Sequence, residues 1–259
     1  MNSRSYGYLF AIAVTLVPAT LHAECRATSG KGTVALFEMY TSEGCDSCPP
    51  ADRWLAGLKL GPGATPAVAL AFHVDYWDRL GWRDRFGSAA FTQRQYEQAD
   101  RRGDSFVYTP QVLLQGRNFP SWQSGEPPTT AVGAINAKPT KATIELSAQT
   151  VERDGLSVDL QVRIPEAKDR PNAVATVALT QNGLASDVKA GENAGKRLSH
   201  EHVVRALESN LPLSTAGELH RTVHFALPAD RGPLSIVAFA ENTKTGEVLQ
   251  ALALPLCAP

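Results

Sequence analysis

The first half of the chain alternates between short, continuous apolar runs and longer segments with helical spacing. Apolar runs at residues 34–40 and 67–76 predict buried strands, and segments 49–60 and 88–101 predict helices. Two prolines open the first helical segment, where their missing N–H groups leave no helical hydrogen bond unmade. Strand, helix and strand in this order predict a parallel pair of strands with a right-handed connection.

The remainder of this half contains shorter elements. We predict a strand at 110–115, a weak fourth strand at 118–122 and a closing helix at 127–137. Just beyond this helix, near Lys138 and Pro139, the pattern changes from alternating strands and helices to strands alone. We therefore expect a first, α/β domain over residues 24–137.

Beyond residue 138 helical spacing nearly disappears, and short runs mix alternating apolar and β-branched residues. The predicted strands are 143–149, 156–164, 173–180, 218–227, 234–242 and 248–254. Residues 199–209 are an exception, because their spacing predicts a helix. Five or six strands separated by turn residues are typical of a β-sandwich, so we predict a sandwich-like second domain over residues 138–259.

Composition and charge narrow the possible functions. The 25 Lys and Arg residues are balanced by 26 Asp and Glu residues, which gives a formal charge of −1. Such a balance lacks the basic surface that binds nucleic acid, so we expect no nucleic-acid partner. A hydrophobic content of 43% over 259 residues is enough for a sizeable core.

The first 23 residues differ from the rest of the chain. Arg4 is the only charged residue before Glu24, an apolar stretch covers residues 8–17, and Ala23 offers a small residue for cleavage. These features are typical of a secretory signal peptide. About ten apolar residues are too few for a membrane span, which needs roughly 20. We expect a periplasmic or secreted protein, in a compartment where disulfides persist, with no membrane span after cleavage.

The strongest chemical signal is Cys45-Asp46-Ser47-Cys48, which lies between a predicted strand and a predicted helix. Free N–H groups and the helix dipole stabilise a thiolate at a helix N-terminus, so Cys45 is the predicted attacking thiol. Cys48 can then resolve the mixed disulfide that forms at Cys45. The pair predicts thiol–disulfide exchange with protein thiols or disulfides, without a cofactor.

Thr109-Pro110 supports this interpretation because it directly precedes the third predicted strand. In thioredoxin-like domains a cis-proline at this place in the order of elements faces the Cys-x-x-Cys pair. Only ~5% of X–Pro bonds in folded proteins are cis, so the dipeptide by itself is weak evidence. Its position before the third predicted strand is what indicates a cis bond. The order of elements predicts a thioredoxin-like domain in which Pro110 shapes the groove for a partner and Thr109 lines it.

Several motifs together resemble a known family. They are EMYTSEGCDSCPPAD at 38–52, FHVDYWD at 72–78, YTPQV at 108–112, GENAG at 191–195 and HVVR at 202–205. These motifs are similar to those of a family of secreted bacterial proteins of unknown function with a thioredoxin-like fold. The resemblance covers most of the chain after residue 23. It implies the fold and says little about the activity.

Two other functions fit the same pair of thiols. Two thiolates can bind a soft metal ion such as Cu(I), which would make the protein a metal-binding or chaperone module. The pair can also be an inert disulfide in a non-catalytic secreted protein. A closed zinc site normally uses four Cys or His ligands, and the chain has no second Cys-x-x-Cys, so we assign no metal site.

Four further residues are candidates for the site. Glu38 precedes Cys45 by seven residues, and thioredoxins have a buried acid near this place that takes up protons during exchange. His73 and Asp75 alternate on one predicted strand and so share a face, near the strand end where sites gather in parallel sheets. Trp77 follows as a possible substrate contact. An ordinary structural role remains open for each of the four: a solvent-reaching carboxylate, a hydrogen-bonded polar pair, or aromatic packing.

Two cysteines remain, Cys25 and Cys257, at opposite ends of the chain that follows the signal peptide. Free thiols are a liability in an oxidising compartment, so we predict a structural disulfide between them. The alternative is that both stay unpaired on mobile termini.

The charges around the pair bear on the direction of exchange. Glu43, Asp46 and Asp52 lie near Cys45 in the sequence, and Arg53 is the only nearby base. Like charges oppose ionisation of a thiol and offset the helix N-terminus. We therefore expect a potential nearer to that of thioredoxin than to that of a strong oxidant, and hence a reductase or isomerase with an upstream reductant.

Overall fold

Strands β2 (Ala35–Thr41) and β3 (Ala67–His73) lie at the centre of the fold, and every side chain in both is buried. They pair in parallel, as the two apolar runs predicted. The computed structural model describes residues 24–61, 66–151, 155–230 and 232–257, so the predicted signal peptide lies outside the described residues. No helix within these ranges is long and apolar enough to cross a membrane.

Both halves of the chain contribute strands to one mixed sheet of eight strands, in the order β14-β13-β8-β11-β3-β2-β4-β5. The other six strands are β4 (Gln111–Leu114), β5 (Arg117–Asn118), β8 (Ala173–Gln181), β11 (Val203–Pro212), β13 (Leu234–Asn242) and β14 (Val248–Pro255). The two groups of strands join where Val203 of β11 lies parallel to Ala71 of β3. Strand pairing thus continues across the predicted domain boundary at residue 137.

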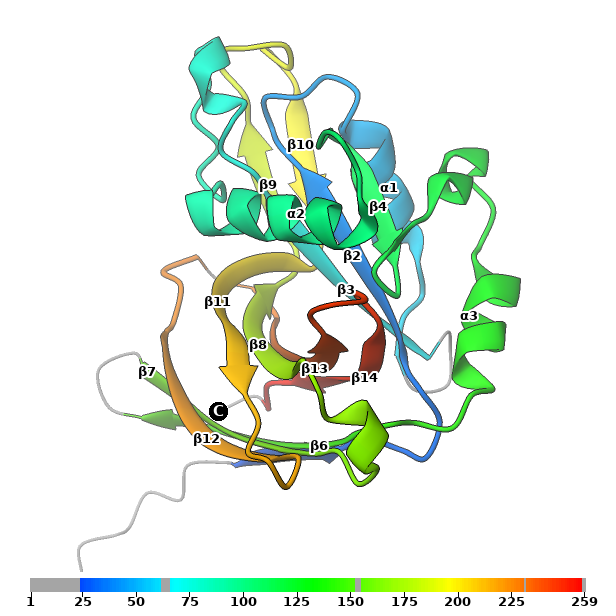
Figure 1. Ribbon diagram of the computed structural model, residues 1–259. Coiled ribbons are helices and arrows are strands. Elements are labelled where there is room, and N and C mark those ends of the chain that lie inside the picture. Colours follow the sequence, from blue (N-terminus) through cyan, green and yellow to red (C-terminus); the bar gives the residue numbers. More distant parts are fainter. Residues whose placement is uncertain (1–23, 62–65, 152–154, 231, 258–259) are drawn as a thin grey trace, which may run out of the picture.

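A second, antiparallel sheet has four strands in the order β1-β6-β7-β12. They are β1 (Cys25–Thr28), β6 (Thr143–Val151), β7 (Gly155–Arg163) and β12 (Glu218–Ala226). Its apolar side chains pack against those of β8, β13 and β14 in one core, and Figure 1 shows the two layers facing each other. A separate two-stranded hairpin consists of β9 (Leu184–Asp187) and β10 (Arg197–His200).

The helices cover the first-half strands on both faces. Helices α1 (Pro49–Gly57) and α3 (Thr129–Asn136) pack against one face, and α2 (Ala89–Arg102) packs against the other. Three short 3-10 helices are η1 (Asp78–Leu80), η2 (Pro120–Ser124) and η3 (Ala167–Asp169). Neighbouring residues of β2 therefore point to different helices. Phe37 faces α1, and Leu36 faces α2.

Three expectations from the sequence are corrected. Residues 199–209 form parts of strands β10 and β11 rather than a helix, because they pair with β9 and β8. The fourth strand is only the two residues of β5, and Pro120 begins η2 directly after Phe119. Strand β3 ends at His73, so Asp75 lies in the bend that follows and not on the strand.

Candidate functional site

Cys45 and Cys48 lie in the turn that leads from β2 into α1, and they are joined by a disulfide. The sequence placed Cys45 at the helix N-terminus, whereas Cys48 occupies the N-cap position and Cys45 lies three residues before it. Pro49 and Pro50 start the helix, where no N–H is needed. Both cysteines are 0% exposed, although Asp46 and Ser47 between them are exposed. The disulfide is therefore shielded from solvent.

A loop from the second half of the chain covers this turn. Asn193 is fully buried, and its Nδ2 donates to the carbonyl oxygens of Glu43 at 2.9 Å and Cys45 at 2.8 Å. Next to it, Glu192 Oε2 accepts a hydrogen bond from the Asp46 N–H at 3.1 Å. The sequence suggested a simple turn here. The available signal was that this segment belongs to the motifs shared with the family.

A buried carboxyl group lies one helical turn after Cys48. Asp52 accepts a hydrogen bond from Thr41 Oγ1 at 3.0 Å, and its backbone N–H donates to the Cys48 carbonyl at 3.1 Å. Burial raises the pKa of Asp52, although His200 and His73 act in the opposite direction. A carboxyl with a raised pKa on the same helical face as Cys48 is suited to exchange a proton with a thiol.

Two buried histidines lie beside this carboxyl. The ring of His73 is 4.9 Å from that of His200, and its Nδ1 lies 2.7 Å from Asp84 Oδ2. Burial alone lowers the pKa of His73, but the carboxylates of Asp84, Asp52 and Glu43 together outweigh burial, and the pKa of His73 is raised. His200 Nε2 lies 3.3 Å from Glu43 Oε1, whereas the sequence had suggested no role for this histidine.

Glu43 connects the histidines to the cysteine turn. Its carboxylate accepts a hydrogen bond from Trp82 Nε1 at 2.8 Å, and its backbone N–H donates to Asp84 at 2.9 Å. Burial acts to raise the pKa of Glu43, but the nearby His200 ring and the hydrogen bond from Trp82 help to lower it. Within the described residues, no three His, Cys, Asp or Glu side chains are arranged to hold a metal ion.

Trp77 and Thr109 meet beside the cysteine turn. Trp77 Nε1 donates to Thr109 Oγ1 at 2.7 Å, and the Thr109–Pro110 peptide bond is cis, as the sequence predicted. Trp77 also packs closely on Gly44, where an added Cβ would lie 3.0 Å from the Cβ of Trp77. The structure therefore brings together Trp77, Thr109 and the residue that precedes Cys45.

Glu38 and Asp75 lie on the other face of the sheet, toward α2. Glu38 Oε2 accepts a hydrogen bond from Arg94 at 2.7 Å, and Arg94 also pairs with Glu241 at 3.0 Å. The Asp75 carboxylate accepts a hydrogen bond from Thr92 of α2 at 2.6 Å. The expected shared face for His73 and Asp75 is therefore wrong, because the strand ends between them.

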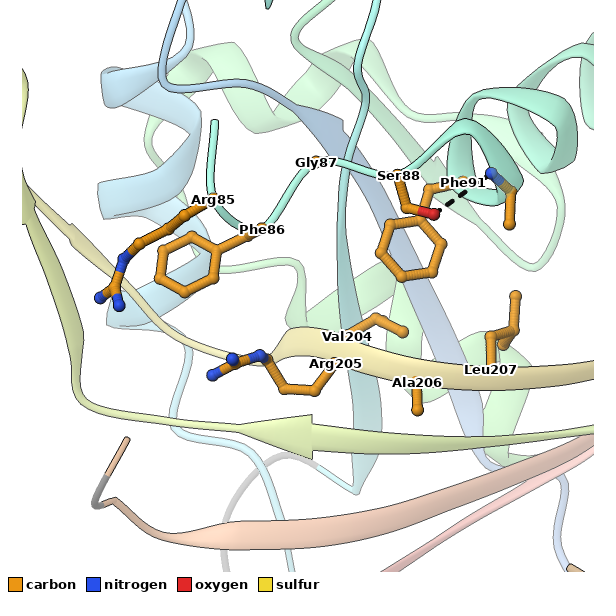
Figure 2. A pocket seen from close by; sticks show the side chains of 10 residues that line it. Arg85, Phe86, Gly87, Ser88, Phe91, Val204, Arg205, Ala206 and Leu207 are labelled. Atoms are coloured by element: carbon orange, nitrogen blue, oxygen red, sulfur yellow. Dashed lines mark hydrogen bonds between the residues drawn. The ribbon is translucent and has the colours of Figure 1, made fainter. Parts of the chain in front are cut away.

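A hollow of about 330 Å³ lies between the start of α2 and strand β11 (Figure 2). Phe86 and Phe91 provide apolar walls, and Arg85 and Arg205 lie together at one end. Both guanidinium groups pair with Asp230, at 3.0 and 3.2 Å. None of the site residues predicted from the sequence lines this hollow, so we restrict the candidate site to the cysteine pair and its surroundings.

The remaining two cysteines are joined as well. Cys25 of β1 forms a disulfide with Cys257, 232 residues further along the chain. Cys25 lies in the four-stranded sheet and not in the sheet that leads to the cysteine turn. The bond ties the first described strand to the last described residue. No cysteine among the described residues is free.

Comparison with known proteins identifies relatives of the whole fold. The chain is similar to protein AGR_C_4864 from Agrobacterium tumefaciens, with 25% identity, a TM-score of 0.55, and coverage of 87% of this chain and 96% of that chain. It also resembles HBP35 of Porphyromonas gingivalis, with 14% identity, a TM-score of 0.63, and coverage of 86% and 75%, a likeness of fold alone. No curated protein sequence matches the chain.

The family is identified by its sequence model. A model described as "Protein of unknown function (DUF1223)" matches residues 36–240, which include the cysteine pair, Thr109-Pro110 and the loop that contains Asn193. The resemblance to a family of unknown function is thereby confirmed. Because the match covers well over half of its length, the chain belongs to the DUF1223 family.

Proposed function

We propose that this protein carries out thiol–disulfide exchange at Cys45 and Cys48 in the periplasm or outside the cell. The observation that carries the proposal is the disulfide at the start of α1, directly after the central strand β2. The strand order β3-β2-β4-β5, with α1 and α2 on opposite faces, supports a thioredoxin-like arrangement of the first half. Within this arrangement Thr109–Pro110 precedes β4, as expected for the proline of a partner-binding groove.

In the reductase direction, the Cys45 thiolate attacks a disulfide of a partner protein. The partner's S–S bond breaks, one of its sulfurs leaves as a thiolate and takes up a proton, and a mixed disulfide forms with Cys45. Cys48 then loses its proton and attacks the Cys45 sulfur, which releases the partner's second thiol and forms the Cys45–Cys48 disulfide. A thiol reductant supplies two electrons to start the next cycle.

We assign the proton from Cys48 to Asp52 rather than to Glu38. Asp52 follows Cys48 by one helical turn, is buried, and has a raised pKa because of burial. Glu38 lies on the face toward α2 and is paired with Arg94. Glu38 is therefore held in an ion pair on the face of the sheet opposite to α1 and Cys48.

The partner is expected to be a protein with thiols or disulfides. Phe106, 70% exposed, and Tyr108 form a tilted aromatic pair just before Thr109, with ring centroids 6.1 Å apart. Exposed aromatic side chains of this kind suit contact with a polypeptide. The two disulfides fit an oxidising compartment, where the signal peptide would send the chain.

Trapping of a mixed disulfide tests the proposal. Cys48→Ser should accumulate mixed disulfides at Cys45 in an exporting cell, and purified wild-type protein should accelerate reduction of insulin by dithiothreitol. Cys45→Ser should abolish both. Absence of trapped partners and of reductase activity, together with tight 1:1 binding of Cu(I) to the reduced protein, would instead establish the metal-binding alternative.

A further inference from the structure

The cysteine pair has no surface that a partner thiol can reach. Both residues are 0% exposed. Exchange requires a thiolate to approach one sulfur along the S–S axis. Something that covers the pair must therefore move before exchange can take place at this disulfide.

The loop at residues 191–195, which we call the cover loop, is bonded directly to the turn that holds the pair. Its side chains replace hydrogen bonds that the cysteine turn would otherwise make with water. Asn193 donates to the carbonyl groups of Glu43 and Cys45, and Glu192 accepts from the Asp46 N–H. Three backbone groups of the turn are thus bonded to two consecutive residues that follow it by about 150 positions.

The cover loop is held in a defined shape by its own hairpin. It forms the tip of β9–β10, where Gly195 donates to the Val188 carbonyl at 2.9 Å and Lys196 Nζ donates to Asn193 Oδ1 at 2.8 Å. Gly191 has a φ of +71° and packs on Trp82, with 3.2 Å between an added Cβ and the Cβ of Trp82. A side chain at this position would be both strained and crowded.

The hairpin that carries the cover loop pairs only with itself among the described strands. Its tip can therefore move away from the cysteine turn without breaking a hydrogen bond of the eight-stranded sheet. The contacts that would be lost include those made by Asn193 and Glu192 and the packing of Gly191 on Trp82. Opening of this kind is local and costs less than global unfolding.

We propose that the cover loop controls access to the disulfide, with Asn193 as the residue that keeps it closed. The proposal deepens the exchange function above, because it states which partners can react: those that bind to the open hairpin or displace its tip. Asn193 is a positioning residue, since it acts on the Cys45 backbone and not on sulfur. Closure keeps the disulfide from small thiols in its surroundings.

Reduction kinetics test this proposal without any protein substrate. The full-length mature protein is mixed with dithiothreitol or glutathione, samples are quenched by alkylation, and the Cys45–Cys48 peptide is quantified by mass spectrometry. Asn193→Ala should accelerate reduction by about tenfold. This factor corresponds to a loss of ~1.4 kcal/mol in the free energy that favours the closed state over the open state. Glu192→Ala should accelerate it less, because that bond lies at an exposed position.

Two controls separate opening of the cover from general loss of stability. Glu201→Ala removes the same type of bond, a carboxylate that accepts from the Gly183 N–H at 3.1 Å, from the opposite end of the hairpin. It should leave the Cys45–Cys48 rate unchanged. The Cys25–Cys257 disulfide serves as an internal reference whose reduction rate should be equal in all variants. If Asn193→Ala does not fold, Asn193→Asp removes the same donor at nearly constant size and should give the same acceleration.

The outcomes distinguish the cover from the exchange function. Unchanged reduction rates in folded Asn193 and Glu192 variants would overturn the proposal that the cover loop controls access, even if the wild type proves to be an active reductase. Accelerated reduction in a protein that neither traps partners nor reduces insulin would support the cover and overturn the exchange function. Equal acceleration of both disulfides would point to general loosening and also overturn the cover.

Discussion

At the scale of single residues, two of the buried carboxyl groups, those of Glu38 and Asp52, have different surroundings. Glu38 lies against the guanidinium of Arg94, and Asp52 has Thr41 and two histidines around it. Glu38 is therefore held in an ion pair, whereas burial raises the pKa of Asp52. Two substitutions test this difference.

Asp52→Asn should change how stability depends on pH. The pKa of Asp52 is raised in the folded protein because of burial, so the unfolded chain releases this proton at a lower pH than the folded chain does. The wild type should therefore lose stability relative to the variant as pH rises from the unfolded pKa to the folded pKa. Each unit of pKa difference corresponds to about 1.4 kcal/mol.

Urea unfolding of both proteins between pH 3.5 and about 8 measures this effect. The Asp46→Asn variant serves as a control for the loss of a carboxyl group that is exposed rather than buried. A stability difference between Asp52→Asn and wild type that is constant with pH would contradict a raised pKa for Asp52. The variant should also resolve mixed disulfides more slowly, because Cys48 loses its proton acceptor.

Glu38→Ala should destabilise the fold and leave the thiols unaffected. Removing one partner from a buried ion pair leaves an uncompensated charge and costs about 3–5 kcal/mol, toward the lower end here because Arg94 keeps Glu241. Glu97→Ala, which removes a partly exposed pair with Arg101, should cost under about 1 kcal/mol. Loss of exchange activity in folded Glu38→Ala would mean that Glu38 acts as a proton acceptor during exchange.

At the scale of elements, helix α1 and the acids around its start act on the cysteine pair in opposite directions. The helix N-terminus favours a thiolate by about 0.3–1 kcal/mol. Glu43 and Asp52 are buried close to the turn, and Asp46 lies within it. Negative charges near a thiol raise the free energy of the thiolate.

We therefore predict a reduction potential for Cys45–Cys48 near that of thioredoxin, roughly −270 mV, rather than roughly −120 mV as in a strong oxidant. Equilibration with glutathione buffers measures it. The Asp46→Asn variant should have a slightly higher potential, because one negative charge is removed. A wild-type potential above about −160 mV would mean that the helix outweighs the acids and that the protein acts as an oxidant.

At the scale of the whole molecule, the two halves share strands and the two ends share a disulfide. Strand β11 of the second half pairs with β3 of the first, and β1 from the start of the described chain pairs with β6. Cys25 and Cys257 then close almost the whole chain into one loop. The cysteine turn and its cover therefore depend on segments from both halves.

Removal of the Cys25–Cys257 disulfide should lower stability without altering the site. In the entropic model, a loop of this length restricts the unfolded chain by ~5.5 kcal/mol. Cys25→Ser combined with Cys257→Ser should therefore lower the urea midpoint, while the reduction rate of Cys45–Cys48 stays the same. An accelerated rate in the folded double variant would mean that this bond also supports the cover loop.

The sequence alone determined the features that depend on neighbours along the chain. Apolar runs predicted β2 and β3, prolines at its first positions located the start of α1, and Cys-x-x-Cys located the redox pair. Helix α2 was predicted within one residue of each end from its helical spacing. In the structure the Ser88 side chain accepts a hydrogen bond at the helix N-terminus, and Gly103 ends the helix in a left-handed conformation. These signals act within a few residues, so they can be recognised without the fold.

Only the tertiary structure decided features that depend on contacts between distant segments. Residues 203–209 have helical spacing, yet they form a strand because β8 supplies a ladder of hydrogen bonds. Asn193 covers the cysteine turn, and His200 reaches Glu43, although about 150 residues separate each pair. Glu38 points to Arg94 because alternation along β2 directs it toward α2. Local patterns carry no information on which distant side chain fills a buried position, so packing alone determined these partners.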